Sequence, residues 1–245
     1  MKISTILQQQ AFLAGVLSVV LNGCAVKEAD ITPEGLLSVL GPSPDFSLEN
    51  LPKDWIIEKE GSLNKNQLQI VTKNNKSALK ITNAKNTFTI ARRINAMMLA
   101  TPFLSWSWFV EQSSIQGYHP LSIVVGFRGG DSRSHNQSSR SFNWFGNTLP
   151  EHDRAIKLTW GESALQRGTL NPPQNRTKLS QSYTVRGGRE NTGLWWLETI
   201  DVSNLYSKIW PEDNIASIRI VFIGVSAVAE RLPAPIQFSS IKLSR

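Results

Sequence analysis

From residue 55 onward the chain is a series of short segments, many of them alternating between apolar and polar residues, bounded by glycine, asparagine and proline. Side chains of a β-strand point alternately to the two faces of a sheet, so a period of two is typical of half-buried strands. The segments are QLQIVTK (67–73), ALKITN (78–83), TFTIARRI (87–94), FLSWSWFVE (103–111), LSIVVGFR (121–128), AIKLTWGE (155–162), SYTVRGG (182–188), LWWLETIDV (194–202), SIRIVFIGV (217–225) and IQFSSIKL (236–243). About ten short strands favour two packed antiparallel sheets.

The only helix expected within this region is short. It is VSNLYSKIW (202–210), with Ser203 as the expected N-cap and Pro211 just beyond its end. The sequence therefore predicts an all-β fold over residues 54–245, a jelly-roll-like antiparallel β-sandwich with one short helix.

The first residues have the pattern of an export signal. Lys2 precedes an apolar run over residues 11–21, which is shorter than the roughly 20 residues that a membrane-spanning helix needs and typical of a secretory signal peptide. The run ends in Leu-Asn-Gly-Cys, which resembles the bacterial lipobox. The resemblance implies removal of residues 1–23 and lipid attachment at Cys24, and Ala25 in place of Asp implies the outer membrane.

Cys24 is the only cysteine of the chain, so no intrachain disulfide can form. The alternative to lipidation is a free cysteine that follows a short apolar run by chance. Residues 24–53 are rich in proline and are expected to be a lipidated tether, in which LLSVL could form a helical turn before Gly41. The sequence thus predicts a domain anchored to the outer membrane, with the periplasmic side favoured and the outer surface left open as the alternative.

The net charge of +7 could indicate an anionic partner. The positive residues are scattered, however, with no run of five or six like charges, and this favours a role in solubility. The densest stretch runs from Arg128 to Arg140 and has a basic loop character. The predicted partners are the membrane, through the lipid, and a glycan or an envelope protein, with no nucleic acid.

The order of the segments is itself informative. ALKITNAKNTFTIARRI, LSWSWFVE, IVVGFRGGD, IKLTWGE, WWLETIDVSNLYSKIWPEDNIASIRIVFIGV and IQFSSIKL follow one another over about residues 55–245. This order resembles the bacterial family of domains of unknown function number 3047, which implies an exported β-sandwich and no established activity. The chain departs from the family pattern in GYHPLSIVVGF, which lacks acidic residues, and in IGVSAVAERLPAP, where Glu230 is the only acid.

No motif for catalysis or metal binding stands out. The three histidines, His119, His135 and His152, lack the spacing of a ligand set, apart from a loose pair of His152 with Asp153. There is no G-x-S-x-G motif, and FRGGD is interpreted as a turn. The sequence predicts no metal, no cofactor and no assigned catalytic residue.

A pair of carboxylates for glycoside cleavage stays open, since two acids a few ångströms apart suffice. The candidates on strands are Glu111, Glu162 and Glu198. Each of them is also explained by a solvated face or a strand end.

The aromatic residues carry most of the functional information. In LSWSWFVEQ, alternation places Trp106 and Trp108 on one face with Leu104 and Val110, which favours a core role for Trp106 and leaves Trp108, nearer the strand end, open. In LWWLETIDV, adjacent tryptophans face opposite ways, so one of them is expected to point outward.

Candidate stacking residues for a sugar ring lie elsewhere. They are Trp144 and Phe145 in the segment SFNWFGN, with Trp160, Trp195 and the cation Arg128. The alternative is that these aromatics close an open end of the sandwich. The sequence favours non-catalytic binding of a glycan or other envelope polymer. A lipoprotein that docks another envelope protein and a carbohydrate-active enzyme remain as alternatives.

Overall fold

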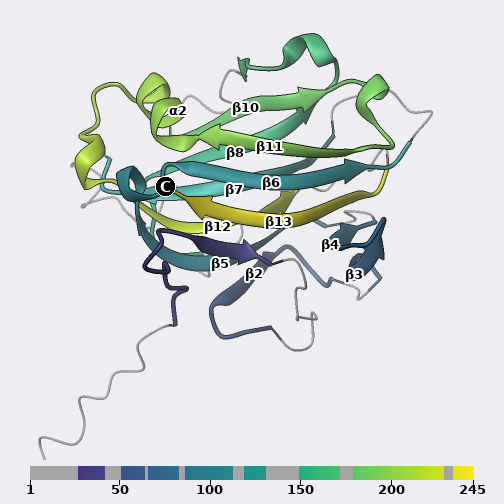
Figure 1. Cartoon of the computed structure of the whole chain (residues 1–245), viewed down its shortest axis with the longest axis horizontal. Helices are drawn as coiled ribbons and strands as arrows, with labels where there is room; N and C mark the ends of the chain where they lie inside the picture. Colours follow the sequence, from purple (N-terminus) through teal and green to yellow (C-terminus); the bar gives the residue numbers. More distant parts are fainter. Residues whose placement is uncertain are drawn as a thin grey trace, which may run out of the picture.

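The protein is a β-sandwich of two sheets (Figure 1). The computed structural model describes residues 27–41, 51–63, 66–82, 86–112, 119–130, 149–171, 179–228 and 234–245. In Figure 1 strands β11, β6 and β13 lie in front, and the strands of the second sheet lie behind them. The predicted all-β sandwich with one short helix is confirmed for the described residues.

The six-stranded sheet has the order β11-β6-β13-β4-β3, and β1 also pairs with β13. Its strands are β1 (Leu37–Leu40), β3 (Leu68–Lys73), β4 (Lys76–Ile81), β6 (Phe103–Val110), β11 (Trp195–Asp201) and β13 (Ile236–Ser244).

The seven-stranded sheet has the order β2-β5-β12-β7-β8-β10-β9. Its strands are β2 (Trp55–Lys59), β5 (Phe88–Met97), β7 (Leu121–Arg128), β8 (Arg154–Gly161), β9 (Leu170–Asn171), β10 (Ser180–Gly187) and β12 (Arg219–Ala227). Every segment predicted from alternation overlaps a strand, whereas β1, β2 and β9 were not predicted.

One strand pair departs from the predicted antiparallel arrangement. β8 and β10 run parallel, with Ala155 opposite Ser180 and Gly161 opposite Gly187. A parallel pair needs a crossover instead of a tight hairpin, and residues 162–179 between the two strands include the 3₁₀ helix η3 (Ala164–Gln166) and strand β9. A strand alternates between apolar and polar residues whether its partner runs parallel or antiparallel. The sequence pattern therefore could not show that β8 and β10 run parallel.

The segment LLSVL, expected to contain a helical turn, is mostly strand β1, so that expectation is wrong. Leu37 pairs with Leu243 of β13, and Leu37, Val39 and Leu40 are buried. An isolated helical turn could not bury these side chains or satisfy its backbone, whereas the free side of β13 offers both a hydrogen-bonding edge and the core.

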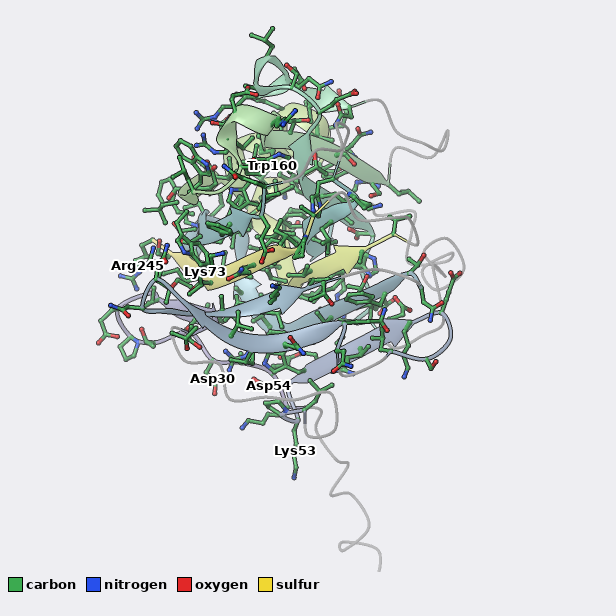
Figure 2. All side chains as sticks on the ribbon, turned by 90° about the vertical axis from the view of Figure 1, so that its right-hand side faces the viewer. Asp30, Lys53, Asp54, Lys73, Trp160 and Arg245 are labelled. Carbon is green, nitrogen blue, oxygen red and sulfur yellow. The ribbon has the colours of Figure 1, made fainter. Side chains whose placement is uncertain are left out.

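Further contacts tie residues of the expected tether to the sandwich. Ala29 forms a parallel bridge with Ile94, and its amide donates to the carbonyl of Arg93 at 2.9 Å. Arg92 of β5 forms an ion pair with Asp54 at 2.7 Å and donates to the carbonyl of Ser38. Asp30 and Asp54 both lie near the lower end of the molecule in Figure 2. Ala29 and strand β1, which belong to the expected tether, are therefore hydrogen-bonded to strands of the sandwich.

Helix α2 (Val202–Ile209) follows β11 directly. Its N-cap is Asp201, whose carboxylate accepts from the amide of Asn204 at 2.9 Å. The expected cap, Ser203, lies inside the first turn and donates its hydroxyl to Asp201 at 2.6 Å. In the described ranges no helix is long and apolar enough to cross a membrane.

The core lies between the sheets, and both tryptophans of the LSWSWFVEQ segment belong to it. Trp106 and Trp108 are fully buried, with ring centroids 5.5 Å apart in an edge-to-face arrangement. The prediction that Trp106 is a core residue is confirmed. Trp108, whose role the sequence left open, is a core residue as well. On the other face of β6, Ser105, Ser107 and Phe109 are also buried. Other side chains therefore cover part of the outer face of this sheet.

Candidate functional site

The candidate ligand-binding residues do not form one cluster. Trp144 and Phe145 lie outside the described residues, as does Cys24. The other three are described, and they fall in three different environments.

Trp160 is a core residue, which corrects the expectation of an exposed stacking ring. Its side chain is 3% exposed, and its ring meets Trp108 edge-to-face at 5.3 Å between centroids. In Figure 2 it lies inside the body of the molecule. The reason is the alternation of its own strand, which places Trp160 on the same inward face as Ile156 and Leu158.

Arg128 ends β7 and is exposed. Its guanidinium lies 3.8 Å from the carboxylate of Glu151, and both side chains are more than half exposed. The preceding residue, Phe127, contacts Tyr206 of α2 at 5.0 Å between ring centroids. Because α2 follows the end of β11 at which Asp201 lies, Arg128 is near the opposite end of the sandwich from Trp195, the first residue of β11.

Trp195 points outward, as expected for one of the two adjacent tryptophans. Trp195 is opposite Phe109 in the β6–β11 ladder, and Trp196 is opposite the buried Trp108. Trp196 therefore faces inward, where the guanidinium of Arg186 lies 3.8 Å from its ring centroid. Trp195 is half-buried on the outer face of the six-stranded sheet.

Trp195 belongs to a group of aromatic and cationic side chains on that outer face. We call this group the lysine–aromatic face; it comprises Lys73, Lys76, Lys80, Phe109, Glu111, Trp195 and Gln237. The Phe109 and Trp195 ring centroids are 5.6 Å apart. The ammonium of Lys73 lies 4.1 Å from the Phe109 centroid, and that of Lys76 lies 5.3 Å from the Trp195 centroid.

These contacts require the sheet to bend. Lys73 is on β3 and Phe109 is on β6, with β4 and β13 between them. Three interstrand spacings amount to about 14 Å in a flat sheet, yet the ammonium of Lys73 reaches the ring of Phe109. The β3–β4 hairpin therefore curls across the outer face toward β11. Figure 1 shows this hairpin at the lower right, beside the end of the sheet where β13 begins.

The hairpin turn fixes where the two lysines lie. Asn74 and Asn75 both have positive φ, 51° and 60°, as a two-residue type I′ turn requires, and asparagine tolerates this conformation. The turn places Lys73 directly opposite Lys76. Both side chains consequently leave the hairpin on the same face, toward the rings.

Beneath the lysines the face has polar groups. Glu111 forms an ion pair with Lys80 at 2.8 Å and accepts from the side-chain amide of Gln237 at 3.2 Å. Two buried polar atoms lack a hydrogen-bond partner among the described residues, the Gln237 Oε1 acceptor and the Trp195 Nε1 donor. Leaving such groups unpaired costs about 1–3 kcal/mol each, so the face holds one unmet donor and one unmet acceptor.

The three carboxylates considered for glycoside cleavage are not brought together. Glu111 lies on the outer face with Lys80. Glu198 is buried between the sheets, where it accepts from Trp108 Nε1 at 3.3 Å and pairs with Arg186. Glu162 is exposed in the turn after β8.

Of the described histidines, His119 is buried and His152 is half-buried, and a ring nitrogen of each lies within hydrogen-bond distance of a backbone carbonyl. His119 Nε2 lies 2.9 Å from the carbonyl of Ala234, and burial lowers the pKa of His119 to about 4. His152 Nδ1 lies 2.8 Å from the carbonyl of Pro150, and burial also lowers the pKa of His152. His135 is outside the described residues. Within the described ranges, no three His, Cys, Asp or Glu residues are grouped as metal ligands would be.

A second polar cluster was not predicted. Arg154 forms a two-pronged ion pair with Asp213 at 3.0 and 3.2 Å, and the Tyr206 hydroxyl donates to Asp213 at 2.8 Å. Burial and the Asp213 carboxylate raise the pKa of Tyr206. Beside this cluster, Asp153 accepts from the amides of Gly129 and Gly130, and Gly129 has a φ of 103°. Gly129 therefore has the positive φ that the interpretation of FRGGD as a turn requires, whereas Asp131 lies outside the described residues.

The lysines of the lysine–aromatic face were also missed. Their signal was present in the sequence as Lys-Asn-Asn-Lys between two alternating segments, which is a hairpin turn flanked by like charges. The rings that these lysines reach are far away in the chain, and the bend that joins them leaves no local pattern.

Comparison with known proteins gives one family and several distant structures. The sequence model of a family described as a protein of unknown function (DUF3047) matches residues 54–231. No curated protein matches the sequence.

The similar solved structures include the Humicola grisea Cel12A catalytic domain, with 10% identity and a TM-score of 0.39 over 89% of this chain and 97% of that chain. They include the family 11 carbohydrate-binding module of Clostridium thermocellum in complex with a mixed-linked tetrasaccharide, with 10% identity and a TM-score of 0.37 over 87% and 97%. They also include the K1 adhesin domain of Lys-gingipain from Porphyromonas gingivalis, with 14% identity and a TM-score of 0.33 over 81% and 95%. At such scores, the ligands of those proteins do not transfer to this chain.

Proposed function

The chain belongs to the DUF3047 family, as its ordered motifs predicted, and on that premise we propose that its sandwich binds a glycan without catalysis, at the lysine–aromatic face. The observation that carries the proposal is Trp195, a half-buried tryptophan on an outer sheet face whose Nε1 is an unmet donor. Gln237, whose Oε1 is an unmet acceptor, is in register with it across Phe109.

A sugar ring needs both kinds of contact. Its apolar face stacks on an aromatic ring, and its hydroxyls find hydrogen-bond donors and acceptors around that ring. Trp195 offers the ring, while its Nε1 and the Gln237 Oε1 offer the donor and the acceptor. The exposed Leu197, two residues further along β11 on the same face, extends the apolar surface beside Trp195.

The test is Trp195→Ala in a glycan-array screen, followed by titration of each hit. The variant should lose binding and keep the far-ultraviolet circular dichroism spectrum of the wild type. Leu165→Ala, which changes a 92% exposed side chain on η3, is the control and should bind as the wild type does. Equal binding by Trp195→Ala would contradict the assignment of the site.

We propose further that the protein is a lipoprotein of the bacterial outer membrane, anchored through Cys24 and facing the periplasm. The support is the signal pattern that ends in Leu-Asn-Gly-Cys. Radiolabelled palmitate should be incorporated into the wild type and not into Cys24→Ala, and the variant should leave the membrane fraction. Labelling of Cys24→Ala would contradict the anchor.

A second candidate function, docking of an envelope protein, is favoured by one observation. Leu194, just before β11, is 55% exposed, and Leu197, within it, is 69% exposed; β11 is an edge strand of the six-stranded sheet. A partner strand could pair with such an edge. In that case Leu194→Arg would abolish capture of the partner from membrane extract, whereas glycan binding at Trp195 would persist.

A further inference from the structure

We infer that the ligand of the lysine–aromatic face is an anionic polysaccharide, one whose sugar rings carry carboxylate or sulfate groups. The inference rests on the proposed function, because it names the class of glycan that the same site takes. It comes from the charges around Trp195 and from the contacts that hold them.

The end of the sheet at which Trp195 lies carries more positive than negative charge. Lys73, Lys76 and Lys80 come from the β3–β4 hairpin, and the one carboxylate in the group is Glu111. Glu111 is already paired with Lys80 at 2.8 Å. The ammonium groups of Lys73 and Lys76 contact aromatic rings, and neither has a carboxylate partner among the described residues. Two positive charges thus remain uncompensated there.

The placement of these two charges works against the stability of the hairpin. Lys73 and Lys76 are directly opposite each other across the type I′ turn, and like charges in directly opposed positions destabilise a strand pair. The rings of Phe109 and Trp195 offset part of this repulsion, since a cation over an aromatic face is attracted to it. An anionic group between the two ammonium groups would remove the repulsion altogether.

The same lysines also cover the stacking surface. Lys76 lies over the ring of Trp195, where a sugar would have to lie. Its side chain is exposed and flexible, so moving it aside costs little. A neutral sugar would have to displace the ammonium without giving it a new partner. An acidic sugar would displace it and pair with it, so that one exchange places the ring on Trp195 and the acid group on Lys76.

This exchange explains why the donor and acceptor of the face are unmet. Trp195 Nε1 and Gln237 Oε1 are buried in the state in which the lysines lie over the rings. Withdrawal of Lys76 from the Trp195 ring toward an anion would let a sugar approach that ring and its Nε1. Ring stacking, hydroxyl recognition and charge recognition are then parts of one binding event.

The experiment uses the full chain purified with its anchor in detergent, and compares binding to polygalacturonate, dextran sulfate and an uncharged β-1,4-galactan. The variants are Lys73→Gln/Lys76→Gln, Trp195→Ala and Lys242→Gln. Lys242 is the matched control because it is exposed on the same outer face but pairs with Ser105, away from Trp195. Thermal unfolding of each variant shows that the fold is kept.

We expect the wild type to bind at least one of the two acidic polymers, with affinity that falls as salt is raised. The double lysine variant should bind about tenfold more weakly, Trp195→Ala should not bind, and Lys242→Gln should stay within about twofold. The polymer that binds distinguishes carboxylate from sulfate recognition, and either one supports the inference.

Two results overturn it, and they are distinguishable from each other. The charge inference fails if the wild type binds the neutral galactan as tightly as the acidic polymers and the double lysine variant has the affinity of the wild type. Glycan binding at Trp195 then stands. If no polymer binds and a wider glycan array is blank, the proposed function itself fails.

Discussion

Trp108 and Glu198 are hydrogen-bonded between neighbouring strands of the six-stranded sheet, with the indole Nε1 of Trp108 donating to the carboxylate at 3.3 Å. The same carboxylate pairs with Arg186 of the opposite sheet. A single buried acid thus joins the two layers of the sandwich at the edge where β11 and β10 lie.

Removing this acid should destabilise the fold strongly. Glu198→Ala leaves the guanidinium of Arg186 buried without its carboxylate, and breaking a buried pair from one side costs about 3–5 kcal/mol. Urea unfolding measures the loss. Glu162→Ala, at an exposed carboxylate, is the control and should change the free energy of unfolding by less than about 0.5 kcal/mol. Equal stabilities for the two variants would contradict the bridging role.

Strand β1 and the residue just before it give a matched pair of leucines. Leu40 is 1% exposed and Leu36 is 38% exposed, four residues apart in the same segment. Leu40→Ala should lower the free energy of unfolding by about 2–5 kcal/mol, as deletion of a core leucine does, and Leu36→Ala should have little effect. If the segment were an unstructured tether, both variants would unfold at the same urea concentration as the wild type.

Two tryptophan variants compare the stability contributed by a core ring with that contributed by a surface ring. Trp160→Ala should cost about 3–5 kcal/mol, because the ring is buried against Trp108. Trp195→Ala should cost much less, since its half-buried ring lies on an outer face. Calorimetric melting temperatures compare the two. The assignment of Trp160 to the core would be contradicted by a melting temperature close to that of the wild type.

His119 makes stability depend on pH. Its pKa is about 4 in the folded protein, against an ordinary value of 6.5, because burial disfavours the charged imidazole. Above pH 6.5 the folded and unfolded states are both neutral, and the contribution of His119 is complete. As the pH falls from 6.5 to 4, the unfolded chain binds a proton that the folded protein does not, so the free energy of unfolding decreases.

Urea midpoints measured between pH 7 and pH 4 check this sign. His119→Gln, whose amide can still donate to the Ala234 carbonyl, should show a shallower decline than the wild type over that range. An unchanged slope in the variant would show that His119 is not the group responsible.

The sequence predicted the fold where the cause is local. Trp106 and Ile123 lie on inward faces because their strands alternate, and alternation can be read without knowing the partner strand. The same pattern should have placed Trp160 in the core, because Ile156 and Leu158, four and two residues before it, lie on the same face of the strand. The prediction of Trp160 as a candidate stacking residue is therefore wrong, because its ring is buried.

What could not be predicted depends on pairings between distant residues. Leu37 becomes part of a strand only because β13 has a free edge there, nearly the whole chain length away. Lys73 meets Phe109 only because the β3–β4 hairpin bends over the outer face of the sheet. Neither the bend nor the free edge has a period or a motif, so the sequence pointed to the lysine–aromatic face only through Trp195.

The position of β13 has a consequence for the order in which the molecule is completed. Among the described residues β13 follows every other strand in the sequence, yet it lies between β6 and β4 and also pairs with β1. Until those nine residues have been synthesised, the front sheet consists of separate pieces with open edges. The front sheet can therefore close only after β13 has been synthesised, and a truncation before β13 would remove the centre of that sheet.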